Sequence, residues 1–364
     1  LVYCMMPVQL LFSQQGSLDA PRANILAVPR VSFLVVPVAL AGTALYSLSE
    51  AWGLAMMQLS AWLLRPMWEV LTWLASSDVA LRGWPQPSLP VLVLSTAGVA
   101  LLCVPRGVPG RWAGALLLLP LLFGSRPQPG HGEAWITLLD VGQGLATVVR
   151  TAGHTLVYDT GPAFGPDFDT GRAVVSPYLR YAGIRHINRL VVSHGDNDHI
   201  GGAASLLRDY PHTDVLTSLP AAFSDRAVQT CRQGMRWTWD GVGFEILHPA
   251  PAALHSGNDA SCVLRVTLAD GQRLLLPGDI EAAAERDLLE RHGGDLSADV
   301  LVVPHHGSRT SSTAAFVSAV NPAVALIPAG YLNRYRFPHP DVVARYTAIG
   351  SEVHQTGYTG AITV

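Results

Sequence analysis

The first third of the chain is dominated by long apolar runs. Residues 25–48 form one stretch broken only by Arg30 and a few hydroxyls, and residues 89–105 and 110–124 form two shorter ones. A helix needs about 20 apolar residues to cross a bilayer, although shorter segments cross when partners bury them. The first run is long enough, and the other two suit a tight hairpin of spans. A buried helix of a soluble protein is the alternative, but the runs recur and the charges lie between them.

Residues 49–77 have a different pattern, because four Trp are interspersed with Glu50, Arg65 and Glu69. Trp favours the interface between lipid and water. The pattern therefore fits a helix that lies in the interface, and it equally fits one that lines a polar cavity between spans. Arg65 belongs to a polar pathway in the second case and extends to the interface in the first.

From Trp135 onward the apolar runs shorten to strand length and alternate with Gly, Pro and polar residues. The pattern predicts a helix that begins near Gly201, within the stretch 187–207. It also predicts strands within residues 135–150, 154–162, 187–207, 272–280, 298–308 and 322–330. Four of these strands are followed by acidic or histidine residues. Because strand ends at one edge of a sheet converge, we expect these side chains to meet.

Composition also separates two regions. Residues 1–130 contain 7 Arg and 4 acidic residues, whereas residues 131–364 contain 17 Arg, 23 acidic residues and all 13 His. The Pro- and Gly-containing stretch between them is typical of a linker. We expect membrane helices over 1–125, a linker over 126–132 and a second domain over 133–364. Because the chain opens with Leu inside an apolar run, we expect either a piece of a longer protein or an unusual start codon.

Charge and cysteine content exclude little. The net charge of −3 argues against a general attraction to nucleic acid but leaves room for a local Arg-lined groove. The four Cys have no CxxC spacing, which argues against a zinc ribbon or a thioredoxin motif. Arg106 and Arg111 flank the loop between the last two apolar runs, and the positive-inside rule then places the following domain on the outer face. Arg126 favours the opposite orientation.

The stretch 193–202, SHGDNDHIGG, carries the candidate chemistry. It places two His and two Asp within six positions: His194, Asp196, Asp198 and His199. Imidazole and carboxylate ligands together suit a borderline or hard divalent ion, Zn or Mn. In a loop, alternate residues can face one ion and the last two another. The spacing therefore predicts a two-metal site.

The HxDxDH run at 194–199 resembles the HxHxDH signature of the metallo-β-lactamase superfamily, with Asp196 in place of the middle His. The whole set of motifs resembles the ComEC family of competence DNA-uptake proteins. The set comprises LDVGQG (139–144), YDTG (158–161), LPGDI (276–280), PHHGS (304–308) and the apolar ANILAVPRVSFLVVP (23–37). The resemblance implies an α+β fold, a metallo-β-lactamase-like αββα sandwich preceded by an α-helical transmembrane region.

The resemblance also implies the ligands of two divalent ions. His194 and Asp196 would bind one ion and Asp198 and His199 the other, with Asp279 as the bridge. One of the neighbouring histidines 305 and 306 would complete the set, and the sequence does not say which.

We place His305 with the ligands, and His306 with Asp198 and Asp159 among the catalytic residues. Asp159 would lie beneath the site and orient ligands. The superfamily usually supplies a further His before the bridging Asp. The candidates for it are His212, His248 and His255, with Asn258 and Asp259 near the expected point instead. We therefore expect one ion to be bound weakly.

Two adjacent divalent ions suit phosphodiester hydrolysis, because they activate water and neutralise charge on the phosphoryl group. An Asp in place of a His makes the site harder and better suited to Mn. Arg309, Arg334 and Arg336 follow the metal loops and are candidates for phosphate binding, with Asn258 and His339 as further substrate-binding candidates.

Together with the resemblance to the ComEC family, whose membrane segment forms a DNA channel, these features imply a multi-pass inner-membrane protein whose metal domain lies on the outer face. There it would act as a nuclease that degrades one strand of incoming DNA beside a single-strand channel. Its expected partners are single-stranded DNA, membrane lipid and other DNA-uptake proteins. Two alternatives stay open: a domain that guides DNA without cutting it, and a metallohydrolase for small molecules.

Overall fold

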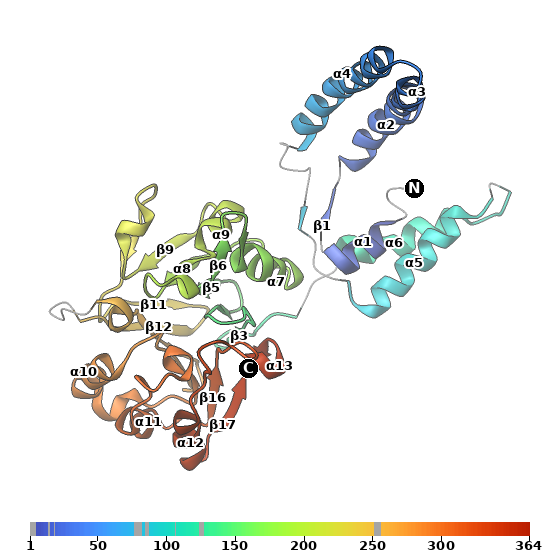
Figure 1. Cartoon of the computed structure of the whole chain (residues 1–364). Coiled ribbons are helices and arrows are strands. Elements are labelled where there is room, and N and C mark those ends of the chain that lie inside the picture. The colour runs from blue at the N-terminus through green and yellow to red at the C-terminus, as the bar shows by residue number, and fades with distance from the viewer. Residues whose placement is uncertain are drawn as a thin grey trace. The chain divides into compact units, whose positions relative to one another are not determined.

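The computed structural model describes residues 5–13, 15–17, 19–75, 82–83, 87–105, 107–123, 127–250 and 256–364. The chain divides into two compact units, which are considered separately (Figure 1). The first contains residues 1–126 with 180–183, and the second contains residues 127–179 with 184–364. Arg106, Arg126 and His255, which entered the sequence argument, lie outside the described residues.

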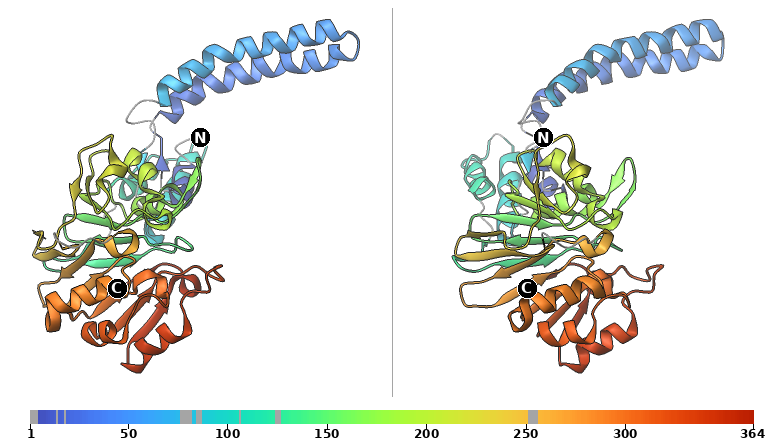
Figure 2. Two further views of the ribbon diagram at one scale, coloured as in Figure 1. Left: turned by 60° about the vertical axis from the view of Figure 1, so that its left-hand side comes forward. Right: turned by 90° about the vertical axis from the view of Figure 1, so that its left-hand side faces the viewer.

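The first unit is helical. Its elements are α1 (Met6–Ser13), β1 (Gln15–Gly16), α2 (Ala20–Arg30), a π-helical segment (Val31–Val35), α3 (Val36–Tyr46), α4 (Glu50–Ala75), β2 (Arg82–Gly83), α5 (Leu89–Cys103) and α6 (Ala113–Phe123). Ala20–Tyr46 is continuous over 27 residues and, among the residues described, is the one helix long and apolar enough to cross a membrane. Figure 2 shows α4 returning alongside it as an antiparallel hairpin.

Within each of the two helical hairpins, the helices pack through small residues or a few polar contacts. A Cβ added to Gly98 of α5 would lie 2.6 Å from the carbonyl oxygen of Gly114, so the two backbones touch there. Close approach at small residues is how helices associate in lipid, where the hydrophobic effect does not drive packing. Between α2–α3 and α4, Arg30 Nε donates to the Leu63 carbonyl (3.3 Å) and Ser60 Oγ to the Val35 carbonyl (3.2 Å). Arg30 and Ser60 thus find backbone acceptors on the facing helix.

The second unit contains two seven-stranded sheets. The first has the order β10-β9-β8-β5-β4-β3-β18. Its strands are β3 (Trp135–Leu138), β4 (Thr147–Arg150), β5 (Thr155–Tyr158), β8 (Arg189–Val192), β9 (Asp214–Thr217), β10 (Gln229–Thr230) and β18 (Ile362–Thr363). β18, β3, β4 and β5 pair antiparallel, whereas β5, β8, β9 and β10 run parallel. A small hairpin of β6 (Ala163–Gly165) and β7 (Phe168–Asp169) stands apart.

The second sheet has the order β11-β12-β13-β14-β15-β16-β17. Its strands are β11 (Arg236–Trp239), β12 (Val242–His248), β13 (Val263–Thr267), β14 (Arg273–Leu276), β15 (Val300–Val302), β16 (Val324–Ile327) and β17 (Glu352–Gln355). β11 to β14 form an antiparallel meander, and β14 to β17 are parallel. The runs RLLL, VLV and VALI are covered on both faces, as parallel strands with continuous apolar sequence require.

Two cores hold the sandwich together. One lies between the sheets and includes Leu138, Val191 and Leu276, and the other lies between the second sheet and its helices and includes Leu288 and Phe316. The helices of this unit are α7 (Ser176–Tyr181), α8 (Asn197–Ile200), α9 (Ala203–Asp209), α10 (Ala282–His292), α11 (Ala314–Val320), α12 (Pro340–Ala348) and α13 (Thr356–Thr359). The expected α+β sandwich with helices outside two sheets is confirmed (Figure 2).

A disulfide joins Cys231, just after β10, to Cys262, just before β13. It therefore links the first sheet to the second, and both cysteines are buried in the core between the sheets. Cys262 also donates its backbone N–H to the Ser193 carbonyl at 3.0 Å. The pair thus lies beside the loop that carries the HxDxDH run, which the sequence spacing alone did not indicate.

Candidate metal centre

The chemistry-bearing residues gather where strands of both sheets end. β5 leads to Asp159, β8 leads to the 193–202 loop, β14 leads to Asp279, and β15 leads to the 304–307 turn. β5 and β8 run parallel in one sheet, and β14 and β15 run parallel in the other. Each of these pairs therefore delivers its loops to one edge, as expected from the sequence.

The HxDxDH loop turns into a short helix at its acidic end. Asp196 is extended at the N-cap of α8, and His199 N–H donates to the Asp196 carbonyl at 3.0 Å. The LDVGQG loop fits against this turn: Leu145 N–H donates to the Asp198 carbonyl at 3.0 Å. Gly144 has φ +147°, and a Cβ there would lie 2.5 Å from the same carbonyl oxygen. The glycine thus lets the motif approach the metal loop.

Four side chains offer ligand atoms that all lie within 4.8 Å of one another: Asp198, His199, Asp279 and His306. His199 Nε2 is 3.1 Å from Asp279 Oδ1, and His306 Nε2 is 3.3 Å from Asp279 Oδ2. His306 Nε2 is also 3.2 Å from Asp198 Oδ2. In the described part of the chain, neither Nε2 makes a hydrogen bond of acceptable geometry, although both atoms are buried. Buried imidazole nitrogens aimed at two carboxylates form a donor set that fits a divalent cation.

Asp159 lies under this cluster and is fully buried. Its Oδ1 accepts from Ser193 N–H at 2.7 Å, and its Oδ2 accepts from Ser193 Oγ at 2.7 Å. His199 Nδ1 lies 2.8 Å from the same Oδ2. With Nδ1 directed at Asp159, the Nε2 of His199 faces the cluster, which is the arrangement by which carboxylates orient metal-binding imidazoles.

The two neighbouring histidines point in different directions. His306 Nδ1 lies 2.8 Å from the Pro328 carbonyl, which turns Nε2 toward the cluster. His305 Nδ1 lies 3.2 Å from Glu281 Oε1, and its Nε2 is 3.9 Å from Asp279 Oδ2. Both residues have left-handed backbones, with φ +49° and +54°. The geometry therefore favours His306, rather than His305, as the ligand, and two successive strained residues produce that choice.

His194 and Asp196 form a smaller pair beside the cluster. The ring of His194 lies 4.2 Å from that of His199, and its buried Nε2 is 3.7 Å from Asp196 Oδ2. Its Nδ1 lies 3.0 Å from Ser193 Oγ. The Asp196 side chain is 60% exposed. This pair offers two donors, fewer than the four of the main cluster.

The electrostatics favour positive charge at the centre of the cluster. Burial opposes a charge on His199, yet Asp279 and Asp159 hold its pKa well above the usual value. Burial also opposes a charge on His306, but Asp279 and Asp198 raise its pKa to about 9. Burial would raise the pKa of Asp279, yet His199 and His306 hold it well below the usual value. Burial and the neighbouring His199 lower the pKa of His194, which favours the neutral imidazole that a metal needs.

The remaining predicted site residues lie around the edge of the metal centre or farther from it. Asn258 donates to Glu281 Oε1 at 3.4 Å, the carboxylate that also faces His305. His339 Nδ1 accepts from the backbone N–H of Asp341 and so caps α12, and its Nε2 lies 2.6 Å from Arg309 Nε.

Of the candidates for the additional His, the two that the structure describes, His212 and His248, do not complete the donor set. His248 Nε2 lies 2.7 Å from the Asp259 carbonyl, and His212 is exposed. Asp259 itself accepts from Glu281 N–H at the start of α10. Ser193 and Ser261 were not predicted, yet their hydroxyls lie 3.0 Å and 3.4 Å from His194 Nδ1. Serine is too common for its position to have indicated this.

Residues 139–331 match the family described as the metallo-beta-lactamase superfamily, and residues 1–109 match the family described as competence protein. The chain therefore belongs to the metallo-beta-lactamase superfamily. It is 36% identical over 348 residues to the competence protein ComA of Neisseria gonorrhoeae, covering 95% of this chain and 48% of that protein. The predicted relation to ComEC-type competence proteins, with a competence domain before the metallo-β-lactamase domain, is confirmed by these matches.

The chain is also similar to a further protein and to a solved structure. The uncharacterized protein YcaI of Escherichia coli strain K12 is 33% identical over 375 residues, covering 99% of this chain and 47% of that protein. The chain thus spans about half the length of these relatives. Among solved structures, the metallo hydrolase Igni18 of Ignicoccus hospitalis aligns with a TM-score of 0.45 at 15% identity, covering 63% of this chain and 98% of that chain.

Proposed function

We propose that this chain acts in DNA uptake as a membrane-anchored, metal-dependent nuclease that degrades one strand of incoming DNA beside a single-strand channel. The observation that carries the proposal is the four-donor cluster, in which the buried Nε2 atoms of His199 and His306 face the carboxylates of Asp198 and Asp279 and, among the described residues, form no hydrogen bond of acceptable geometry. The match of residues 1–109 to a competence domain supplies the biological setting. The proposed division is membrane helices over 1–125, a linker over 126–132 and the metal domain over 133–364.

Within the centre, Asp198, His199, Asp279 and His306 would hold one divalent ion, Mn or Zn. His194 and Asp196, with Asp279 as the bridge, would hold a second ion more weakly because they add only two donors. Divalent ions bound there supply Lewis acidity toward a phosphoryl oxygen and activate water. Asp159 orients the His199 ring by contact with its Nδ1 atom, and Ser193 orients the His194 ring by contact with the Nδ1 atom of that ring.

His305 has a different role in this proposal. Its Nδ1 is held by Glu281 and Thr310, and its side chain is partly exposed at the rim. It is placed to contact substrate, together with Asn258 and Arg309. Positively charged and neutral donors at the rim suit the phosphates of a DNA strand.

We further propose that the metal domain lies on the outer face of the inner membrane. Disulfides persist in oxidising compartments such as the periplasm and are rare in the cytosol. The buried Cys231–Cys262 pair supports an outer location. The positive-inside argument used Arg106 and Arg111. The structure describes the second of these, and Arg111 donates to the Val104 carbonyl at 3.4 Å.

The alternative is a domain that guides DNA without cutting it. Asp198→Asn separates the two, because it removes one donor charge and keeps the side-chain shape. If the domain is a nuclease, cleavage of labelled single-stranded DNA with Mn by the full chain in detergent should fall by at least the roughly 10²–10³-fold that one catalytic group commonly contributes. DNA affinity, which depends on arginine–phosphate contacts, should change little and should fall as salt rises. Equal cleavage by the wild type and the variant would mean that a contaminating nuclease cuts the DNA, and this result would favour the guide.

A further inference from the structure

Two exposed tyrosines, Tyr331 and Tyr335, lie in the loop that follows β16, and a third, Tyr358, contacts the first of them. Tyr331 is 63% exposed, Tyr335 49% and Tyr358, on α13, 71%. Tyr331 and Tyr358 meet edge to face with ring centroids 5.6 Å apart. We call residues Tyr331–His339 the rim loop. Large aromatic faces that are exposed to water are unfavourable by themselves. Exposed rings of this kind are typical of a surface that binds a ligand with flat apolar faces.

The rings of the rim loop form a series that reaches the metal loop. The Arg334 guanidinium lies 4.7 Å from the centre of the Tyr335 ring, which stacks on Phe337 at 5.6 Å with an 18° angle between planes. Phe337 in turn meets His305 edge to face at 5.9 Å. His305 directly precedes His306 of the donor cluster. A series of π faces therefore leads from solvent to the metal centre.

The rim loop is held in one conformation. The Asn333 side chain donates to the carbonyls of Gly330 (2.9 Å) and Phe337 (2.6 Å) and accepts from Phe337 N–H (2.9 Å). Leu332 and Arg336 have left-handed backbones, with φ +49° and +58°. At the metal side, His339 N–H donates to the Gly307 carbonyl at 2.8 Å. Strained backbone of this kind persists where a loop is fixed for a function.

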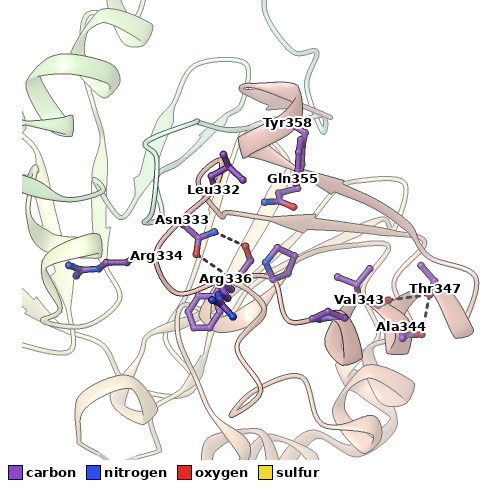
Figure 3. A pocket seen from close by; sticks show the side chains of 12 residues that line it. Leu332, Asn333, Arg334, Arg336, Val343, Ala344, Thr347, Gln355 and Tyr358 are labelled. Carbon is purple, nitrogen blue, oxygen red and sulfur yellow. Dashed lines mark hydrogen bonds between the residues drawn. The ribbon is translucent and has the colours of Figure 1, made fainter.

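A cavity of about 780 Å³ opens along this loop and is lined by Arg334, Arg336, Phe337, Gln355 and Tyr358, among others (Figure 3). Its size lies within the range of small-molecule sites, roughly 300–1,000 Å³. In Figure 3, Tyr358 and Gln355 lie on one side of Asn333, and Arg334 extends away from the cavity residues. The cavity thus combines the aromatic side chains of Phe337 and Tyr358 with the cation Arg336.

The cations of the rim loop are available to a ligand. Arg334 and Arg336 are exposed, and neither forms an ion pair with a carboxylate of the described residues. Guanidinium groups bind phosphate through paired donors. Nearby acidic groups are engaged elsewhere: Asp341 faces His339 at 3.4 Å, and Glu352 faces His354 at 3.0 Å.

We propose that the rim loop and Tyr358 form a stacking platform for the unpaired bases of a single DNA strand, whose phosphates are bound by Arg334 and Arg336. This rests on the proposed function and specifies its substrate as a single strand. Successive bases stack on exposed rings regardless of sequence, while arginines follow the backbone. Bases within a duplex already have both faces stacked and so cannot use the platform. The series of rings then directs the strand toward His305 and the metal centre.

The test uses the full chain in detergent with Tyr335→Leu, which keeps an apolar side chain but removes the ring. Binding is measured by anisotropy with three labelled probes: a dT strand, an abasic strand of equal length and a duplex. Stacking contributes about 1–3 kcal/mol per base, so affinity for the dT strand should fall about 5- to 150-fold. Affinity for the abasic strand and the duplex should change less than about twofold, because neither stacks. Tyr335→Phe keeps the ring and should restore dT binding.

A second variant tests the cations. Arg336→Gln should weaken the dT and abasic strands alike and lower the slope of log affinity against log salt by about 0.7, the value for one phosphate on a single strand. If Tyr335→Leu binds the dT strand as the wild type does, or weakens all three probes equally, the platform is refuted and the proposed nuclease still stands. If the wild type binds none of the probes and cleaves no DNA, the proposed function itself fails.

Discussion

Replacing Asp159 by Asn would measure what the buried carboxylate does for the metal centre. The residue has φ +58°, a conformation that Asn adopts as readily as Asp, so the backbone should not be disturbed. The carboxylate is surrounded by donors: Ser193 N–H and Oγ each lie 2.7 Å away and His199 Nδ1 lies 2.8 Å away. An amide keeps one acceptor oxygen and turns an NH₂ group toward a donor. At least one hydrogen bond is then lost.

The expected effect follows from these contacts. A hydrogen bond to a charged group contributes about 1.5–3 kcal/mol. Loss of the group that orients a metal-binding imidazole usually lowers metal affinity about 10- to 100-fold, which corresponds to about 1.4–2.7 kcal/mol. The two ranges overlap, so we expect Mn or Zn to bind about 10- to 100-fold more weakly to Asp159→Asn. The fold should persist, because the substitution changes little volume.

The measurement is titration with a competing chelator dye, on the full chain in detergent, with the melting temperature recorded in parallel. Asp214→Asn is the matched control, since it makes the same chemical change at a side chain that is 72% exposed. Metal affinity of the control should match the wild type. If Asp159→Asn melts earlier but binds metal as tightly as the wild type, the carboxylate supports only the fold. If both variants lose affinity equally, the effect is one of overall charge.

Two further predictions concern the bridge and the disulfide. Asp279→Ala should lose bound metal and DNA cleavage together, because Asp279 faces both His199 and His306 of the four-donor cluster; elemental analysis that finds unchanged metal would rule out Asp279 as a ligand. Cys231 and Cys262 are 31 residues apart, so replacing both by Ser should destabilise the domain by about 3–4 kcal/mol in the chain-entropy account. Urea unfolding checks this, and a wild type that is equally stable with and without reductant would contradict it.

The metal loops could be predicted from the sequence because their chemistry is local. The run from His194 to His199 contains four ligand-type side chains in six positions, and an apolar strand precedes it. Asp159 and Asp279 likewise follow buried strands that are readable as apolar runs. Long apolar runs indicated the helices of the first unit for the same reason, since each is specified by its own residues.

Other features depend on contacts that no short stretch contains. The choice between the neighbouring histidines follows from two left-handed residues and from the carbonyl of Pro328, which comes directly after β16. The pairing of Cys231 with Cys262 depends on how the two sheets face each other. β10 and β18 are two residues long, too short to show any periodicity. Arg334 and Arg336 were visible as charges, but the contact between Tyr331 and Tyr358 depends on α13, which lies further along the chain.

The buried imidazole nitrogens bear on the choice between cutting and guiding. His194, His199 and His306 each have an Nε2 atom that is buried and, among the described residues, lacks a hydrogen bond. Leaving such an atom unsatisfied costs about 1–3 kcal/mol. A guide that only binds DNA phosphates gains nothing from three such atoms facing one region, because arginines at the surface already provide that attraction. Protonation of His199 and His306 beside Asp279 is one way to offset this cost, and a divalent cation bound by the same nitrogens and carboxylates is another. A buried donor set of this kind is typical of a metal-dependent hydrolase rather than of a passive channel wall.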